Sequence, residues 1–288
     1  MTSVLITGAT GNVGLEVIKS LQKIDHQLDV YASVRQPDAD RTTFSAYKLK
    51  ILPFDFTNAA TYEYALKEID VLFLLRPPHI SEVEKYFKPI INACLVNKIK
   101  HIVFLSVQGV ENSTIIPHHK IEKLIVASKI PYTFLRPAYF MQNFTTTLQK
   151  DIVTNKQIYL PAGNAKFTLI DVRDIGSVAA IILANPTLHL NKSYELTSRK
   201  KLNFREMTDI INGIAGTDIK YISPNLIRFF ITKRMAGTPT MLIFVMIMLH
   251  YLPRFKKEPA TAKWVEEITG LPPISFEQFI VEHQNLLK

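Results

Sequence analysis

The sequence contains almost no cysteine, since Cys94 is the single one among 288 residues. That scarcity excludes an intrachain disulfide, which needs two cysteines. Cys94 lies in an apolar helical stretch, residues 90–95, which predicts a buried and unreactive thiol. The residues of a first strand follow Met1 almost directly, so we expect no signal peptide. Both observations favour a cytoplasmic protein.

The sequence also lacks an apolar run long enough to cross a membrane. Its longest run, Met241–Leu249, lies in an uncharged segment, residues 236–253, that Gly237, Pro239 and His250 interrupt. A bilayer span needs about 20 apolar residues, so we expect no stable membrane insertion. The run predicts a helix packed into the core as the default, and its methionines would also suit the adaptable wall of an apolar pocket. A peripheral contact with a membrane surface stays open.

Acidic residues are the minority charge, with 25 Asp and Glu against 34 Lys and Arg and a formal net charge of +9. The basic residues cluster at 199–201, 233–234 and 254–257. Such clusters can mark a surface that binds nucleic acid or an anionic membrane. No nucleic-acid-binding motif accompanies them. We therefore predict a solvated basic surface that attracts a polyanionic cofactor, and no nucleic-acid partner.

The most informative stretch is Val4–Gly14, in which apolar residues lead directly into three glycines spaced G-x-x-G-x-x-G. A helical pattern follows, with Val13, Val17, Ile18 and Leu21 on one face. A strand, a tight glycine turn and a helix N-terminus together favour pyrophosphate binding, because backbone N–H groups can approach the phosphates closely. The competing interpretation is a glycine-rich connection that binds nothing. The residues that we expect to contact a dinucleotide here are Gly8, Thr10, Gly11, Asn12, Val13 and Gly14.

Strand and helix patterns alternate six times within the first 137 residues. This alternation predicts an α/β fold, a doubly wound parallel Rossmann sheet with right-handed crossovers. Beyond Tyr139 the pattern loosens, and from about residue 202 it is mostly helical. We therefore expect a dinucleotide-binding domain over residues 1–200 and a smaller, mostly helical substrate or cap region over residues 201–288.

Ligands of such sheets bind at the carboxyl ends of the strands. Arg35 ends the second expected strand, 21 residues after Gly14, near the distance at which a residue meets the adenosine ribose. An acidic residue there would favour NAD, whereas an arginine favours the 2′-phosphate of NADP. Arg35 therefore predicts NADP, and NADPH as its reduced form. A solvent-facing arginine is the competing interpretation.

Asp55 and Phe56 end the third expected strand and could contact the adenine. Asp55 or Thr57 could equally cap the helix that starts near Ala59, and the sequence does not decide between these roles. Further cofactor contacts are expected at the ends of the later strands, namely at Leu75, Arg76, Ser106, Pro137, Tyr139 and Phe140.

Five segments carry a resemblance to a known family. Residues 7–14 look like the T-G-A-T-G-x-x-G signature of atypical and extended short-chain dehydrogenases, and the other four, residues 34–37, 128–144, 170–175 and 269–273, resemble the NmrA-like branch. Within that branch the chain is most similar to the second type of NAD(P)H:quinone oxidoreductase. The branch also contains proteins that bind NADP and regulate transcription without redox chemistry.

The chain departs from the parent superfamily at its Tyr-x-x-x-Lys motif. In register with the family, His118 stands in place of the tyrosine and Glu122 in place of the lysine. We expect Glu122 to raise the pKa of His118, and His118 to contact the substrate or the nicotinamide. The competing role for His118 is the capping of backbone groups. Tyr139 is the second catalytic candidate, and no metal is expected although His119 lies beside these residues.

The resemblance implies an NAD(P)H-dependent oxidoreductase. It would transfer a hydride from NADPH to a quinone or a similar conjugated carbonyl, an acceptor that needs little acid catalysis. The expected partner is thus a small apolar or aromatic acceptor, with residues 241–249 as its apolar seat. The alternative is a non-catalytic NADP(H)-sensing regulatory protein that binds a protein partner. The oligomeric state stays open, with a homodimer as the candidate assembly.

Overall fold

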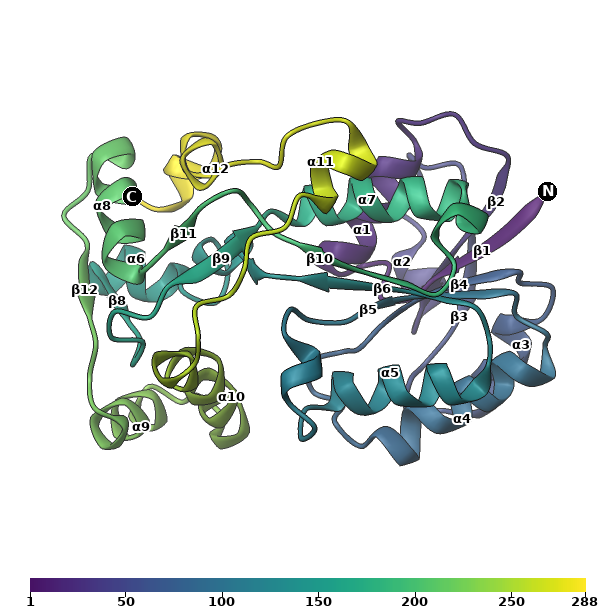
Figure 1. The fold of residues 1–288 in the computed structure, drawn as a ribbon, viewed down its shortest axis with the longest axis horizontal. Coiled ribbons are helices and arrows are strands. Elements are labelled where there is room, and N and C mark those ends of the chain that lie inside the picture. Colours follow the sequence, from purple (N-terminus) through teal and green to yellow (C-terminus); the bar gives the residue numbers. More distant parts are fainter. The chain divides into compact units, whose positions relative to one another are not determined.

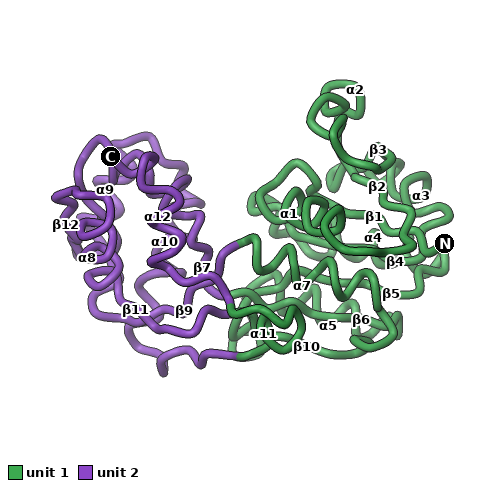
Figure 2. Tube along the Cα trace, turned by 90° about the horizontal axis from the view of Figure 1, so that it is seen from above, with its two compact units in different colours: residues 1–137, 172–196, 263–272 green, residues 138–171, 197–262, 273–288 purple.

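The computed structural model describes residues 1–288, which divide into two compact units. Unit 1 comprises residues 1–137, 172–196 and 263–272, and unit 2 comprises residues 138–171, 197–262 and 273–288 (Figure 2). The chain returns twice to unit 1 after first leaving it. The expected boundary at residue 200 therefore falls inside unit 2, and each unit is assembled from separated segments.

Unit 1 is built on a seven-stranded sheet in the order β10-β6-β5-β4-β1-β2-β3, in which every neighbouring pair is parallel. This arrangement confirms the predicted doubly wound α/β fold. A strand from later in the chain, β10, joins β6 with Lys192 opposite Thr133. The strands are β1 (Thr2–Ile6), β2 (Leu28–Val34), β3 (Lys50–Pro53), β4 (Val71–Leu75), β5 (His101–Leu105), β6 (Tyr132–Pro137) and β10 (Lys192–Leu196).

Helices cover both faces of this sheet. One face carries α1 (Asn12–Leu21), α7 (Val172–Ala184) and α11 (Trp264–Thr269), and the other carries α3 (Ala60–Leu66), α4 (Val83–Val96) and α5 (Pro117–Ser128) (Figure 1). Short turns complete the unit, namely α2 (Pro37–Asp40), η1 (Val110–Asn112) and η3 (Pro186–His189).

The apolar pattern of the sequence explains the centre of unit 1. Val4, Leu5 and Ile6 of β1 are completely buried, as expected for a central strand covered on both faces. The predicted inner face of α1, including Val17 and Ile18, is buried as well. Cys94 is buried as predicted, and burial raises the pKa of its thiol to about 12.

Unit 2 contains two small sheets as well as the expected helices. One sheet has the order β11-β9-β7, with β7 (Tyr139–Phe140), β9 (Phe167–Ile170) and β11 (Lys201–Leu202), and the other pairs β8 (Gln157–Tyr159) with β12 (Lys220–Ile222). Its helices are α6 (Gln149–Asn155), α8 (Phe204–Ala215), α9 (Leu226–Met235), α10 (Thr240–His250) and α12 (Phe276–His283), with the short turns η2 (Met141–Phe144), η4 (Leu252–Phe255) and η5 (Gln284–Leu286). Fully buried phenylalanines, among them Phe144, Phe204 and Phe279, form the core of this unit.

The apolar run at residues 241–249 forms most of α10, as predicted, but the expectation that it packs into the core is wrong for most of its side chains. Ile243 and Met246 are buried, whereas Met241 is 71% and Phe244 is 54% exposed. Only the side of the helix that carries Ile243 and Met246 packs against the core of unit 2. No helix of the protein has the length and apolar character that a membrane crossing requires.

Candidate functional site

The glycine loop forms the tight strand-to-helix turn that the sequence predicts. Gly8 adopts a left-handed φ of +61°, and its carbonyl accepts a hydrogen bond from the Gly11 N–H at 2.9 Å. A Cβ on Gly14 would overlap the backbone of Gly8, so the first turn of α1 lies directly against the loop. Gly11 is the N-cap of α1 and supplies no side-chain cap, while Thr10 and Asn12 are exposed. The loop therefore offers uncapped backbone N–H groups to an anion.

Strand β4 ends beside this loop, at the point where the order of strands reverses. The Thr7 hydroxyl donates to the Phe73 carbonyl at 2.9 Å and accepts from the Leu75 N–H at 3.0 Å. A Cβ on Gly8 would lie only 2.7 Å from the Leu75 side chain, which places Leu75 against the loop. These contacts fix the ends of β1 and β4 at the position where doubly wound sheets bind their ligands.

The parallel sheet brings the other predicted residues of unit 1 to the same edge. Arg35 follows β2, is exposed and has no acidic partner. Ser106 follows β5 and is 2% exposed, and its hydroxyl has no hydrogen-bond partner. Pro137 ends β6, where its carbonyl accepts from the Gln108 N–H at 3.0 Å. An exposed cation and an orphaned hydroxyl are both suited to a polar ligand at this edge.

Arg76 and His118 meet across 42 residues of sequence. The Arg76 Nε–H donates to His118 Nε2 at 3.4 Å, and Arg76 Nη1 donates to the carbonyls of Pro77, Pro78 and Ile80 at 3.1, 3.1 and 2.7 Å. No carboxylate pairs with this guanidinium, and burial lowers its pKa. Arg76 is therefore a fixed positive charge that protein carbonyls hold but do not neutralise.

The expected effect of Glu122 on His118 is wrong. Desolvation by burial, with a smaller contribution from the nearby Arg76 charge, lowers the pKa of His118 to about 3. His118 is thus neutral near pH 7. Because Nε2 accepts from Arg76, the ring proton belongs on Nδ1, which has no partner in the protein. A histidine ordinarily titrates near neutral pH. In this structure His118 instead stays neutral and offers the free Nδ1–H as a hydrogen-bond donor.

Glu122 has a structural role instead. Its carboxylate accepts two hydrogen bonds from Arg136, from Nε at 3.1 Å and from Nη2 at 2.8 Å. Arg136 also pairs with Glu111 at 3.2 Å. The neighbouring His119, and not His118, bonds a backbone group. One of its ring nitrogens lies 3.1 Å from the Val110 carbonyl oxygen. Arg136 was not predicted, although a strand arginine opposite a helical glutamate is a signal for such a pair.

Asp55 and Phe56 have local partners. The Asp55 carboxylate accepts from the Thr57 N–H and from the Thr57 hydroxyl, both at 2.8 Å, and so closes the turn that precedes α3. The Phe56 side chain is 8% exposed, and its ring packs edge-on to Phe54 with 5.1 Å between ring centroids. Neither Asp55 nor Thr57 caps α3, since Ala59 is its N-cap and no side-chain cap hydrogen bond is present there. Little of Phe56 is left for an adenine contact.

Tyr139 and Phe140 belong to unit 2, where they form β7. The Tyr139 hydroxyl lies 3.2 Å from Nε2 of His250, and Nδ1 of His250 lies 2.6 Å from the Met246 carbonyl. His250 Nδ1 therefore donates to the carbonyl, and Nε2 accepts from the tyrosine. Burial raises the pKa of Tyr139 and lowers that of His250 to about 4. The catalytic role of Tyr139 stays a prediction, but its proton is already directed to a neutral histidine.

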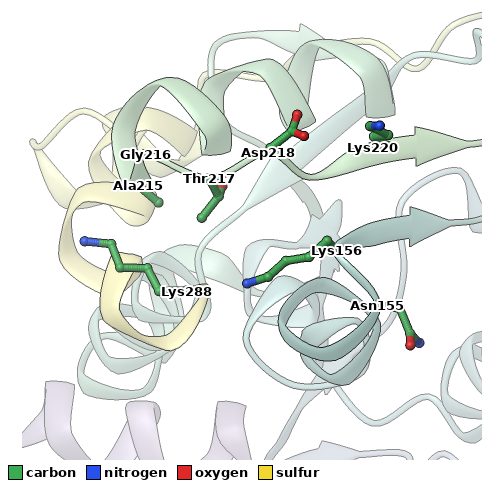
Figure 3. Close-up of a pocket in the computed structure, with 8 residues that line it drawn as sticks. All are labelled: Asn155, Lys156, Ala215, Gly216, Thr217, Asp218, Lys220 and Lys288. Atoms are coloured by element: carbon green, nitrogen blue, oxygen red, sulfur yellow. The ribbon is translucent and has the colours of Figure 1, made fainter.

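His250 is a residue of this unit that the sequence did not single out. The signal was its position directly after nine apolar residues of α10, where a lone polar side chain requires a buried partner. Unit 2 also has an open pocket of about 760 Å³, lined by Asn155, Lys156, Ala215, Gly216, Thr217, Asp218, Lys220 and Lys288 (Figure 3). None of the predicted site residues lines it.

The edge of unit 1 fits a dinucleotide on its own geometry. The glycine cradle would be filled by a Cβ, the N-terminus of α1 lacks a cap, and Ser106 is an orphaned buried hydroxyl. Arg35 and Arg76 add two cations without carboxylate partners. This donor set suits phosphates and polar ribose groups, because each group offers hydrogen bonds or positive charge at a strand end.

Comparisons with known proteins agree with this geometry. Residues 1–237 match the model of the NmrA-like family. Prestalk A differentiation protein A of Dictyostelium discoideum is 30% identical over 282 residues, which cover 97% of this chain and 92% of that protein. NAD(P)H azoreductase of Xenophilus azovorans is 26% identical, with 97% of each chain covered. The NADPH-dependent quinone oxidoreductase of Escherichia coli, solved with NADPH, has a TM-score of 0.85 at 21% identity, covering 97% of this chain and 99% of that one.

Proposed function

This chain belongs to the NmrA-like family, and from that premise we propose that it binds NADPH and reduces a quinone or a similar conjugated carbonyl. The names of its relatives support the reaction class, since they include an NAD(P)H azoreductase and an NADPH-dependent quinone oxidoreductase. The single thiol, buried and with a raised pKa, is compatible with the reducing cytoplasm, where we place the protein.

The observation that carries the proposal is the pairing of Arg76 with His118. A neutral imidazole with a free Nδ1–H is a hydrogen-bond donor suited to a carbonyl oxygen. The adjacent unneutralised guanidinium would favour the anion that forms when a conjugated carbonyl accepts a hydride. A quinone gives a stabilised phenolate-like anion, so a hydrogen-bond donor and a positive charge suffice without a strong acid.

Different residues of the chain would bind the cofactor and stabilise the product anion. The loop from Gly8 to Gly14 would hold the pyrophosphate, and Arg35 the 2′-phosphate. When bound, NADPH supplies the hydride. His118 would donate a hydrogen bond to the acceptor oxygen, while Arg76 keeps His118 in the Nδ1-protonated form. The anionic product would take its proton from water, because the pKa of His118 is lowered to about 3 and the protonated imidazolium is scarcely populated at pH 7.

Steady-state NADPH oxidation with a panel of water-soluble quinones tests this function. We expect His118→Ala to lower kcat/KM about 100-fold, the effect typical of losing one donor to a developing oxyanion. His118→Asn should recover part of the rate, because an amide can donate a similar hydrogen bond. His119→Gln is the matched control, since His119 bonds the backbone instead.

The pH dependence distinguishes a neutral His118 that donates a hydrogen bond from an imidazolium that acts as a general acid near neutral pH. With the pKa of His118 lowered to about 3, kcat/KM should show no His118-dependent loss between pH 8 and pH 6. A His118→Ala variant that retains the wild-type rate would remove this residue from the mechanism. Micromolar NADPH binding without turnover of any quinone would favour the NADP(H)-sensing alternative.

A further inference from the structure

Exposed apolar side chains are concentrated in one short segment of unit 2. Of the 24 large hydrophobic side chains that are exposed in the protein, 11 lie within residues 226–255, which form α9, α10 and η4. They are Ile227, Ile231, Met235, Met241, Leu242, Phe244, Val245, Met248, Leu249, Leu252 and Phe255. We call this set the 226–255 surface. So dense a patch on a protein surface marks an interaction site.

Helix α10 is apolar on all sides. At 100° per residue, its three buried positions, Ile243, Met246 and His250, fall on one side. Six exposed apolar residues occupy a broad arc opposite them, and no charged residue lies between Thr240 and Leu249. A helix at an ordinary water-facing surface carries polar residues on that arc. The second apolar face of α10 therefore requires its own apolar surroundings.

Helix α9 extends the same surface. Ile227, Ile231 and Met235 are spaced four residues apart and are 74%, 51% and 83% exposed, so they form one stripe. The two helices contact each other through the rings of Phe230 and Phe244, whose centroids are 5.8 Å apart. The 226–255 surface is thus a joint face of two helices within one compact unit.

The charged side chains within the segment that carries this surface are all basic. No aspartate or glutamate occurs between Asp218 and Glu258, whereas seven lysines and arginines do: Lys220, Arg228, Lys233, Arg234, Arg254, Lys256 and Lys257. Lys233 is already paired with Asp151. Arg228, Arg234, Lys256 and Lys257 are exposed and have no acidic partner. Exposed apolar side chains beside cations that have no acidic partner complement a partner with an apolar interior and a negatively charged surface.

We propose that the 226–255 surface docks the protein on an anionic lipid bilayer, with α9 and α10 lying in the interface plane and not crossing it. Methionine, leucine and phenylalanine would enter the acyl boundary, and the free cations would meet the lipid phosphates. In a symmetric contact with a second copy, the unpaired cations of one copy would lie opposite the same cations of the other. That repulsion would disfavour such a contact. The substrate part of this inference rests on the proposed function, because apolar quinones partition into bilayers and docking would bring the protein to them.

Vesicle flotation tests the docking, with no substrate present. The protein should float with vesicles of phosphatidylcholine mixed with phosphatidylglycerol, and bind vesicles of phosphatidylcholine alone about tenfold less. The Met241→Glu/Met248→Glu and Lys256→Gln/Lys257→Gln double variants should each lose about tenfold in partitioning. Val281→Glu is the matched control and should float like the wild type, because Val281 is 54% exposed on α12 of the same unit.

Two further measurements keep this test separate from that of the proposed function. Circular dichroism should show that every variant keeps the wild-type fold, and NADPH oxidation with a water-soluble quinone should be unchanged in Lys256→Gln/Lys257→Gln. Equal flotation of wild type and variants would overturn the docking. A dimer in solution that Met241→Glu/Met248→Glu dissociates, without vesicle binding, would also overturn it and assign the surface to a second copy.

Discussion

At the scale of single residues, His118 shows how far surroundings change the chemistry that a residue type suggests. Glu122, four residues after His118, pairs with Arg136 at 2.8 Å and not with His118. The residue that contacts His118 is Arg76, which lies 42 residues away in the sequence. The sequence identifies His118 as a site candidate through family register. It could not predict the lowered pKa, because that depends on burial and on a contact distant in sequence.

The cofactor preference can be tested at Arg35. We expect Arg35→Ala to weaken NADPH binding by tenfold or more, about 1.5–3 kcal/mol for a hydrogen-bonded charge, and to change NADH binding far less. Isothermal titration with both nucleotides measures the two effects. Arg41→Ala is the control, since Arg41 is also exposed and is paired with Asp38 at 3.3 Å. An equal loss for both nucleotides would remove the argument for NADP.

At the scale of elements, unit 1 could be predicted well because its strands are buried on both faces. Such strands read as continuous apolar runs, as Val71–Leu75 does, and the glycine loop marks the first strand-to-helix turn. Unit 2 was predicted less well. Its strands are two to four residues long, as in β11, and too short to leave a periodic signal. The exposure of α10 was also unpredictable, because an apolar run alone does not tell which partners will cover it.

The packing of α1 against α7 gives a prediction at this scale. A Cβ on Gly176 would lie 2.7 Å from the Glu16 backbone, so Gly176→Ala must push the two helices apart. We expect a loss of about 1–3 kcal/mol in the free energy of unfolding, the usual cost of overpacking. Urea unfolding measures it.

Gly213→Ala is the matched control for that substitution. Gly213 lies inside α8 with no atom within 4 Å of an added Cβ, so alanine should be neutral or stabilise the protein by up to about 1 kcal/mol. A Gly176→Ala variant as stable as the wild type would show that α1 and α7 pack less closely than described.

At the scale of the whole molecule, three histidines are kept neutral by burial. The pKa values of His101, His118 and His250 are lowered from 6.5 to about 4, 3 and 4. The unfolded chain therefore binds more protons than the folded one below pH 6.5. The stability that these groups contribute is present above pH 6.5 and is lost as the pH falls toward 4.

Acidification should accordingly destabilise the protein. Between pH 7.5 and pH 5 we expect each of these histidines to remove on the order of 2 kcal/mol from the free energy of unfolding. Urea unfolding across this range measures the slope. His101→Asn should make the slope shallower, whereas a substitution at exposed His79, His79→Gln, should leave it unchanged. A slope that His101→Asn does not alter would contradict the assignment.

We propose above all that this protein transfers two electrons as a hydride from NADPH to a conjugated carbonyl. The most direct measurement is an anaerobic single turnover, with enzyme in excess over NADPH, a water-soluble quinone present and no added flavin or metal. We predict one hydroquinone formed for each NADPH consumed, at a rate that His118→Ala lowers. Tight binding of NADPH that then stays unoxidised, with no hydroquinone formed from any quinone tested, would contradict the account.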